Sequence, residues 1–246
     1  MSRWLEGRVI ENRHWTETLF SLRVEGVALR FEAGQFVRIA LDVAGERIAR
    51  PFSFVNPPQD PVLEFYGVIV PEGPLSPRLA RLAPGDTLYV ADNPSGFLVL
   101  SEVPPAEDLW LVSTGTGIAP FLSILRTETC WERYRRVVLV HGVRRAAELS
   151  YRERIEAIAR ERPGRLVYVP FVSRERAPGA LEGRIPAAIR DGRLEAAAGP
   201  ISSERSQFML CGNPQMLMDV SAALAERGLR KHRRRSPGHI TVEAFW

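Results

Sequence analysis

The chain has 246 residues, enough for two domains of ordinary size, and its 45% hydrophobic and 25% charged residues are typical of a folded protein. Its two cysteines and four scattered histidines exclude a disulfide scaffold and the usual metal or iron–sulfur ligand sets, so redox chemistry would need an organic cofactor. The 33 Lys and Arg against 29 Asp and Glu favour acidic or phosphorylated partners. We expect a cytoplasmic location, because no apolar run spans a membrane and residues 1–6 lack the apolar core of a signal peptide.

Short β-type runs dominate the first hundred residues. They cover residues 8–10, 19–24, 36–41, 63–70 and 87–90, and turns such as Ala83-Pro84-Gly85-Asp86 separate them. A strand also ends at residues 50–53, and one short helix is expected at 75–81. Several runs alternate apolar and polar residues, as half-buried antiparallel strands do. The spacing predicts an N-terminal antiparallel six-stranded β-barrel.

The pattern changes after Pro104-Pro105. Apolar runs at 109–112, 137–140, 166–172 and 208–211 alternate with helical segments at 121–127, 151–160, 185–190 and 215–227. Alternation of this kind predicts a C-terminal α/β domain with a doubly wound parallel sheet. We therefore place a barrel domain at residues 1–101 and an α/β domain at residues 102–246.

The segment Gly115-Thr116-Gly117-Ile118-Ala119-Pro120 follows the first apolar strand of the second domain and nearly spells a dinucleotide-binding fingerprint. In that fingerprint the first glycine makes a tight turn, and the second lets backbone N–H groups approach a phosphate. Proline replaces the third glycine, at the start of the expected helix. Since proline has no N–H and a preset φ, it suits a first helical turn. The segment predicts a variant nucleotide site.

Arg50-Pro51-Phe52-Ser53 ends a predicted barrel strand. Arginine can hold a phosphate through two parallel hydrogen bonds, and an aromatic ring can stack on a flat cofactor. By itself the tetrapeptide is better explained by chance. Its position ahead of the glycine segment makes a cofactor-binding role the stronger interpretation.

Arginines follow the next two strands of the predicted parallel sheet. An NAD-specific fold tends to carry an acidic residue after the second strand, where this chain has Arg144 and Arg145. Ser173, Arg174 and Arg184 add a hydroxyl and two guanidinium groups suited to a 2′-phosphate. Any single one of these arginines is equally well explained as a solvated surface residue. Because they converge at the carboxyl ends of parallel strands, we favour NADP(H) over NAD(H).

Residues 230–235 form the densest basic run, Arg-Lys-His-Arg-Arg-Arg. No aromatic residues interleave it and no nucleic-acid-binding fold accompanies it, so we do not expect nucleic acid as a partner. Steering of an acidic electron-transfer protein is one explanation, and a solvated surface is another of equal weight.

Taken together, Arg50–Ser53, Gly115–Pro120 and Cys211-Gly212-Asn213-Pro214 resemble the ferredoxin–NADP reductase family, in its bacterial branch. The resemblance runs from Gly34-Gln35-Phe36 to the end of the chain. It implies a ferredoxin/flavodoxin–NADP reductase with FAD and NADP(H) as cofactors. Such an enzyme transfers hydride between NADPH and FAD, and single electrons between FAD and ferredoxin or flavodoxin.

The same resemblance implies the residues that bind FAD. Arg50 would meet the pyrophosphate, Phe52 would stack on the isoalloxazine where the family usually has tyrosine, and Ser53 would lie beside flavin N5. A C-terminal aromatic tail would return to FAD. The remaining FAD-binding residues on this basis are Pro51, Tyr66, Gly67, Val68, Ile69, Pro74, Leu75, Ser76, Thr116, Phe245 and Trp246.

For the nucleotide side, the resemblance places the thiol of Cys211 beside the nicotinamide and Glu243 close to it. Ser53, Cys211 and Glu243 are the expected catalytic residues, and no metal ligand is expected. The expected NADP-binding residues are Gly117, Arg144, Ser173, Arg174, Arg184, Cys211, Gly212 and Asn213.

Two alternatives use the same motifs. One is an NADPH-dependent reductase of free flavin or quinone, in which a small molecule accepts the electrons. The other is a flavin-binding electron conduit or regulatory subunit that does not oxidise NADPH, which the arginines and Cys211 argue against.

Overall fold

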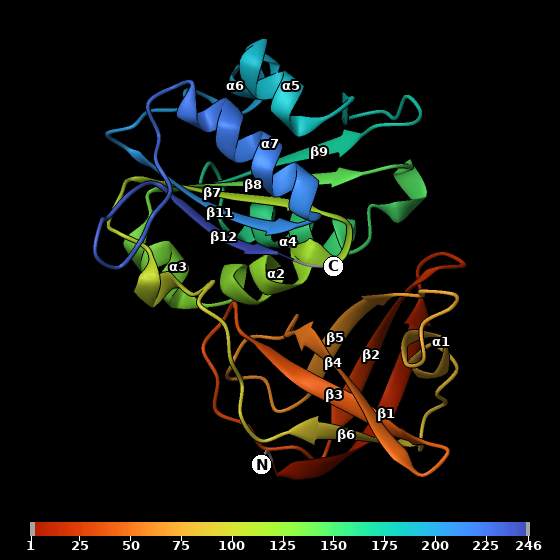
Figure 1. The fold of residues 1–246 in the computed structure, drawn as a ribbon. Coiled ribbons are helices and arrows are strands. Elements are labelled where there is room, and N and C mark those ends of the chain that lie inside the picture. Colours follow the sequence, from red (N-terminus) through yellow and green to blue (C-terminus); the bar gives the residue numbers. More distant parts are fainter. Residues whose placement is uncertain (1–2, 245–246) are drawn as a thin grey trace.

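A computed structural model describes residues 3–244 of the chain, so Phe245 and Trp246 lie outside the described residues. The molecule has two bodies, one built on an antiparallel sheet and the other on a parallel sheet with helices on both faces (Figure 1). Among the described residues, no helix is both long enough and apolar enough to cross a membrane.

The antiparallel sheet has six strands in the order β4-β3-β6-β1-β2-β5. A bridge between Phe54 and Phe65 joins the two end strands, so the sheet curls into a barrel and the predicted architecture is confirmed. A short helix, α1 (Ser76–Leu79), lies between β5 and β6. The strands are β1 (Trp4–His14), β2 (Leu19–Glu25), β3 (Phe36–Val43), β4 (Glu46–Ser53), β5 (Leu63–Val68) and β6 (Thr87–Ala91).

Strand β1 is longer than the predicted run at 8–10. Its first part, Trp4 to Arg8, pairs with β6, and the part from Arg8 to His14 pairs with β2, with an irregularity between Val9 and Glu11. One strand thus bridges two neighbours, and both its ends are half-buried or exposed. The apolar pattern marks only its centre, because the ends contribute little to the core.

The second sheet is entirely parallel, in the order β10-β9-β8-β7-β11-β12. Its central strands are buried on both faces, which explains why they read as continuous apolar runs rather than alternating ones. The strands are β7 (Asp108–Thr114), β8 (Arg136–Val143), β9 (Leu166–Val172), β10 (Leu181–Glu182), β11 (Ser206–Gly212) and β12 (Ile240–Ala244).

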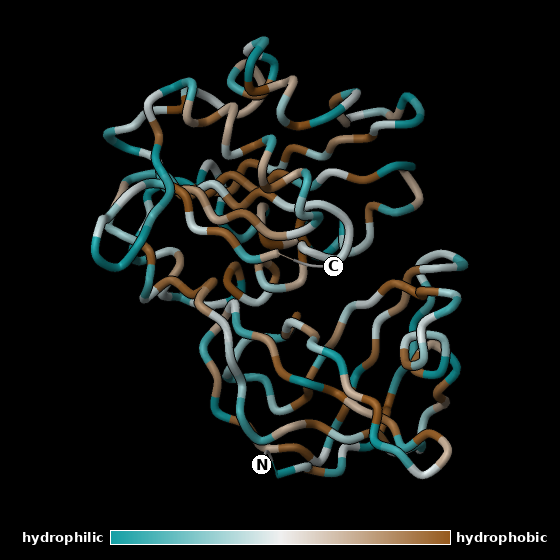
Figure 2. Tube along the Cα trace, in the orientation of Figure 1, coloured by the Kyte–Doolittle hydropathy of each residue, from teal (hydrophilic) through white to brown (hydrophobic). Residues whose placement is uncertain are grey.

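Helices cover both faces of the parallel sheet, as a doubly wound fold requires. Successive residues of β7 point into different cores. Leu109 and Leu111 belong to the core formed with the first group of helices, and Trp110 and Val112 belong to the core formed with the second group. The first group is α2 (Ala119–Leu125), α3 (Glu128–Arg133) and α4 (Arg152–Glu161), and the second is α5 (Ile185–Arg190), α6 (Arg193–Ala198) and α7 (Pro214–Ala225). Hydrophobic segments gather inside this sandwich (Figure 2).

The two halves meet through the α2, α3 and α4 side of the parallel sheet (Figure 1). Barrel residues such as Leu19 and Tyr66 belong to the same apolar cluster as those helices. Polar contacts add to it, since the Tyr66 hydroxyl donates to Ser150 Oγ at 2.8 Å and Ser123 Oγ donates to the Asn56 carbonyl at 2.7 Å. The halves therefore share a buried interface, and a division at residue 101 stays a prediction.

Candidate active site

The strand order of the parallel sheet reverses between β7 and β11, because β8 and β9 lie on one side of β7 while β11 and β12 lie on the other. Ligands of open α/β sheets bind outside the carboxyl ends of the strands at such a point. The glycine segment follows β7, in the 3-10 turn η2 (Gly115–Ile118), and Gly212 ends β11. Both therefore lie at the switch point.

The glycine segment packs directly on the end of β11. A Cβ on Gly117 would lie 2.6 Å from the carbonyl oxygen of Cys211 and 2.9 Å from Cα of Gly212. Only glycine allows the two segments to approach so closely. Helix α2 then begins at Ala119 with Pro120 in its first turn, as the sequence predicts.

On the barrel side, the candidate residues occupy two adjacent strands. Ser53 ends β4, and Phe52 precedes it with its ring half-buried. Since Phe54 bridges Phe65, the antiparallel register brings Phe52 opposite Gly67, where a Cβ would lie 2.8 Å from the Phe52 ring. This glycine leaves the space that the aromatic ring fills.

The other candidate residues of the barrel differ in which of their groups are open to a ligand. Arg50 is exposed and its guanidinium donates to the Ala49 carbonyl at 2.8 Å, while Ser76 Oγ accepts the Val70 N–H at 2.9 Å. The Tyr66 side chain points into the interface with the other half, and burial raises its pKa well above the ordinary value. Residues 66–69 can therefore serve a ligand mainly through their backbone and the exposed side chain of Val68.

Cys211 and Glu243 lie together on the parallel sheet, and a set of neighbours where the halves meet links them to Ser53. Cys211 in β11 pairs in register with Glu243 in β12. Glu243 Oε2 lies 3.0 Å from the Cβ position of Gly96 in the barrel half, and that position is 3.1 Å from the ring of Phe36, which pairs with Ser53. A continuous set of neighbours thus links Ser53 to Cys211.

The electrostatics of this junction are unusual. Burial raises the pKa of Glu243 to about 7, partly opposed by the backbone N–H of Phe97, which donates to the carboxylate. Burial, and then the nearby Glu243, raise the pKa of the Cys211 thiol well above its ordinary value, so the thiol is protonated. Ser53 Oγ and Glu243 Oε1 are buried, and neither has a hydrogen-bond partner within residues 3–244. Such orphaned atoms fit a ligand that supplies the missing partners.

The expected phosphate-binding arginines gather at the carboxyl ends of β8 and β9. The Arg174 N–H donates to the Arg144 carbonyl at 2.9 Å, which sets the two residues side by side. Arg184 follows β10, at the N-terminus of α5. In the described part of the chain, none of these three exposed arginines forms an ion pair, whereas their neighbours Arg145 and Arg176 pair with acidic residues. The three thus carry charge available to an anion.

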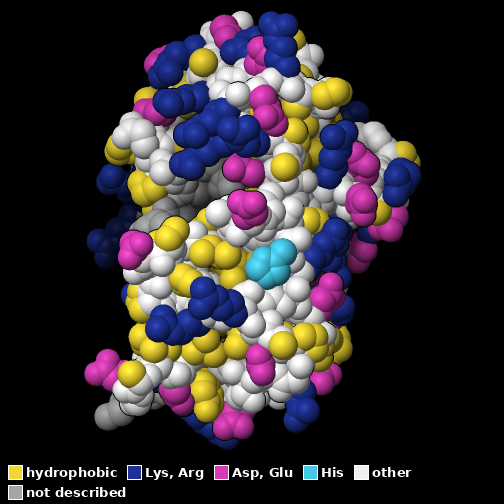
Figure 3. Space-filling model, turned by 90° about the vertical axis from the view of Figure 1, so that its right-hand side faces the viewer, with side chains coloured by type: hydrophobic (Ala, Val, Ile, Leu, Met, Phe, Trp, Pro, Cys, Tyr) yellow, Lys and Arg dark blue, Asp and Glu magenta, His cyan; other side chains and the backbone are white. Residues whose placement is uncertain are grey.

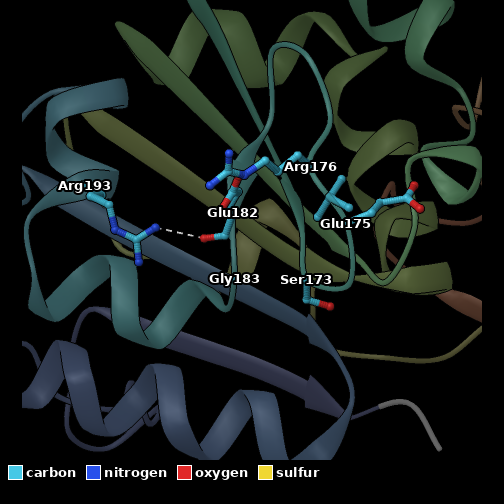
Figure 4. A pocket seen from close by; sticks show the side chains of 7 residues that line it. Ser173, Glu175, Arg176, Glu182, Gly183 and Arg193 are labelled. Carbon is cyan, nitrogen blue, oxygen red and sulfur yellow. Dashed lines mark hydrogen bonds and ion pairs between the residues drawn. The ribbon is translucent and has the colours of Figure 1, made fainter.

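A surface hollow of about 510 Å³ opens among residues that follow β9 and β10, next in the chain to Arg174 and Arg184 (Figure 4). Ser173 lies on its wall, and Arg193 closes it from the side of α6 by donating to the Glu182 carbonyl at 2.8 Å. On this side of the molecule, Lys and Arg side chains gather over the parallel-sheet half, and the surface is hollowed between the halves (Figure 3). The remaining lining residues are Val172, Glu175, Arg176 and Gly183.

Asn213 and residues 230–235 have structural partners. The Asn213 side chain accepts N–H groups of Gln215 and Met216 through Oδ1 and so caps α7. Its backbone N–H donates to Thr114 Oγ1 at 3.2 Å, and its carbonyl accepts from Leu217. In the basic run, Arg234 makes two hydrogen bonds to the Glu102 carboxylate and lies over the ring of Phe97. This arginine is therefore a paired residue rather than a freely solvated one.

Sequence patterns missed several parts of the site. Gly96 and Phe97, which touch Glu243, lie in an irregular segment with no motif, and His141 lies buried at the end of β8 beneath Gly115. The only available signal for His141 was its place at the carboxyl end of a predicted parallel strand.

A barrel and a nucleotide-binding parallel sheet that converge on one cleft define the class of two-domain flavoprotein reductases. Residues 111–222 match the family described as "Oxidoreductase NAD-binding domain". The chain is 48% identical over 248 residues to the flavodoxin/ferredoxin–NADP reductase of Escherichia coli (strain K12), covering 100% of both. It is 39% identical to the ferredoxin–NADP reductase of Pseudomonas aeruginosa, covering 99% of this chain and 98% of that one.

A solved structure agrees. The crystal structure of a ferredoxin NADP⁺ reductase from Neisseria gonorrhoeae with bound FAD and NADP superposes with a TM-score of 0.95 at 32% identity, covering 100% of both chains. The chain belongs to the flavodoxin/ferredoxin–NADP reductase family. The resemblance drawn from the three sequence motifs is thereby confirmed.

Proposed function

We propose that this chain is an FAD-dependent oxidoreductase that transfers hydride between NADPH and FAD, and single electrons between FAD and ferredoxin or flavodoxin. The observation that carries the proposal is the set of neighbours that links Ser53 of the barrel to Glu243 and Cys211 of the parallel sheet. Full-length similarity to flavodoxin/ferredoxin–NADP reductases supports it. The cytoplasmic location is part of the same proposal.

The barrel residues fit FAD. Ser53 offers a buried hydroxyl without a partner among residues 3–244, Phe52 offers a half-buried ring, and Arg50 offers an exposed guanidinium. We assign FAD contacts as well to Pro51, to residues 66–69 and 74–76, and to Thr116. Phe245 and Trp246 belong to this proposed set but lie outside the described residues. When bound, FAD supplies both the hydride and the one-electron chemistry.

The nucleotide residues fit NADP(H). Arg144, Arg174 and Arg184 present uncompensated charge beside Ser173, at the sheet edge where the adenosine end of a dinucleotide would lie. Gly117, Cys211, Gly212 and Asn213 line the switch point, where the nicotinamide end would lie.

The catalytic residues would act through position and protonation. Ser53 Oγ can donate its hydrogen to the ligand atom that faces it, because no protein acceptor competes within the described chain. Cys211 stays a thiol and shapes the wall of the nicotinamide pocket. Glu243 can hold or release a proton at Oε1 near neutral pH, since its pKa lies close to 7.

Anaerobic titration of the purified flavin-loaded protein with NADPH tests the proposal. We expect the flavin absorbance to bleach in proportion to added NADPH, and an oxidised ferredoxin or flavodoxin to restore it. A flavin that stays oxidised would refute NADPH oxidation and favour an electron conduit.

Salt dependence separates the possible electron acceptors. With an acidic ferredoxin or flavodoxin as acceptor, the rate should fall as the salt concentration rises from low to high, because screening weakens electrostatic steering. Rates that do not depend on salt concentration and are highest with free flavin or a quinone would instead indicate a small-molecule reductase.

A further inference from the structure

His141 is a fully buried titratable residue that the proposed chemistry does not use. It lies in β8, and its Nε2 is 3.0 Å from the carbonyl oxygen of Gly115. A carbonyl oxygen only accepts hydrogen bonds, so Nε2 must carry the proton. Nδ1 is buried and finds no partner in residues 3–244, which leaves the bond to Gly115 as the one polar contact of the ring there.

This bond holds the first peptide of the glycine segment. Gly115 has a φ of +55° and opens the 3-10 turn η2, whose backbone hydrogen bonds hold this peptide from within the segment. The bond from His141 adds a side-chain anchor from the sheet. In a planar trans peptide the carbonyl and the next N–H point in opposite directions. Because the Gly115 carbonyl points at the buried ring, the Thr116 N–H points away from it.

We propose that His141 is a positioning residue: its Nε2–H locks the Gly115–Thr116 peptide so that the Thr116 N–H faces the pyrophosphate–nicotinamide part of NADP(H). This inference rests on the proposed function. The ring acts as a neutral donor, because burial lowers the pKa of His141 to about 4. Its role therefore does not switch with pH in the neutral range.

A matched pair of variants tests the position of the donor. The amide nitrogen of Gln in His141→Gln reaches about as far as Nε2, whereas that of Asn in His141→Asn stops near Nδ1. We measure the dissociation constant of NADP⁺ for the flavin-loaded proteins by calorimetry. Asn should weaken NADP⁺ binding by about tenfold, the equivalent of one well-made hydrogen bond, and Gln should restore it to within about threefold of the unmodified protein.

Adenosine 2′-monophosphate is the control ligand. It carries the phosphate that suits the arginines but no pyrophosphate or nicotinamide, so its affinity should be the same in all three proteins. The proposal is overturned if His141→Asn binds NADP⁺ normally, if Gln fails to rescue, or if both ligands weaken together. An unmodified protein that binds neither ligand would contradict the proposed function itself.

The tautomer can be observed without any substitution. In protein labelled with ¹⁵N at histidine, the ring proton of His141 should appear on Nε2 from about pH 5 to about pH 9, and NADP⁺ should leave it there. A proton on Nδ1 in the unmodified protein would overturn the proposal even if the variants fail to fold.

Discussion

Glu243 is the residue whose chemistry depends most on its surroundings. Its carboxyl is near Cys211 of β11 and accepts the N–H of Phe97 from the barrel half, and burial holds its pKa at about 7 instead of 4.5. A single donated hydrogen bond does not offset the desolvation of the charged form. This group therefore changes its charge within the range where most enzymes work.

Replacing Glu243 with Gln should remove a pH-dependent step. With a one-electron acceptor, the overall reaction passes on two electrons and leaves one proton. Only the ionised carboxylate can accept that proton, so the rate should rise by about tenfold as pH increases through about 7. We expect the steady-state rate of the Gln variant to be lower than that of the unmodified protein at pH 8 and to stay constant as pH changes. The measurement is the steady-state rate with a one-electron acceptor, and a Gln variant that keeps the rise would contradict this role.

The same shift predicts the effect on stability. Folding raises the pKa from 4.5 to about 7, so the folded state favours the protonated acid. Stability linked to this group is fully present below the unfolded pKa and is lost as pH rises to about 7. Urea unfolding at pH 8 should therefore show the Gln variant as the more stable protein, with little difference at pH 5.

Arg174 and Arg184 should determine the choice between nucleotides. Charge-assisted bonds to a 2′-phosphate contribute about 1.5–3 kcal/mol, so replacing either with Ala should raise the KM for NADPH by roughly tenfold to a hundredfold and leave that for NADH unchanged. Arg145→Ala is the matched control, because Arg145 already pairs with Glu175. Equal losses with both nucleotides would disprove the assignment.

At the scale of elements, the contact between the glycine segment and β11 fixes the shape of the crevice. Gly117 lies against backbone atoms of Cys211 and Gly212, and backbone cannot move aside as a flexible side chain can. A methyl group there would push the segment off the strand end. The crevice therefore depends on a backbone-to-backbone contact rather than on side-chain packing.

We expect Gly117→Ala to lower kcat/KM for NADPH at least tenfold, because a Cβ would lie 2.6 Å from the Cys211 carbonyl oxygen. Gly45→Ala is the control, because it makes the same substitution where the Cβ position has open space around it. Gly45 lies in the turn between β3 and β4. It should lose about 1 kcal/mol of stability from its positive φ and keep its activity. Normal nucleotide kinetics in Gly117→Ala would show that the contact is dispensable.

The sequence predicted the elements with strong periodicity and missed the weak ones. The central parallel strands and helices α2, α4, α5 and α7 were expected, because each carries an apolar run or face. Helices α3 and α6 bury only two residues each, whereas the equally short α5 buries four, so neither α3 nor α6 shows a clear period. Strand β10 has two residues and β12 is half-buried. Their positions are set by tertiary contacts instead.

The site divides in the same way. Ser53, Cys211 and the glycine segment belong to local motifs and were predicted. Gly96 and His141 were missed, because their roles depend on contacts with residues far away in the sequence. Local patterns do not encode such pairings.

At the scale of the whole molecule, charged pairs join the two halves. The buried Glu64 of the barrel pairs with Arg154 of α4 at 2.8 Å, and Asp60 pairs with Arg126 at 3.4 Å. These contacts lie on the same side as the shared apolar cluster. The halves should therefore unfold together rather than one at a time.

Replacing Arg154 with Met should destabilise both halves together. The substitution leaves the Glu64 carboxylate buried without its partner, at a cost of about 2–4 kcal/mol. Arg190→Met is the control, because the Arg190–Glu226 pair lies within one half, is about half exposed and should contribute less than about 1 kcal/mol. Thermal unfolding should stay a single transition, and two separate transitions in the unmodified protein would show that the halves fold independently.

The bridge between Phe54 and Phe65 also bears on how the protein behaves in concentrated solution. A sheet whose end strands meet offers few free N–H and C=O groups to a neighbouring molecule, so the barrel half gives little opportunity for strand addition between chains. In the other half, one edge is β10, with only two residues, and the other is β12. The N–H and carbonyl of Ile240 in β12 already bond to Arg230 and His232, so this edge also offers little backbone to a neighbouring chain.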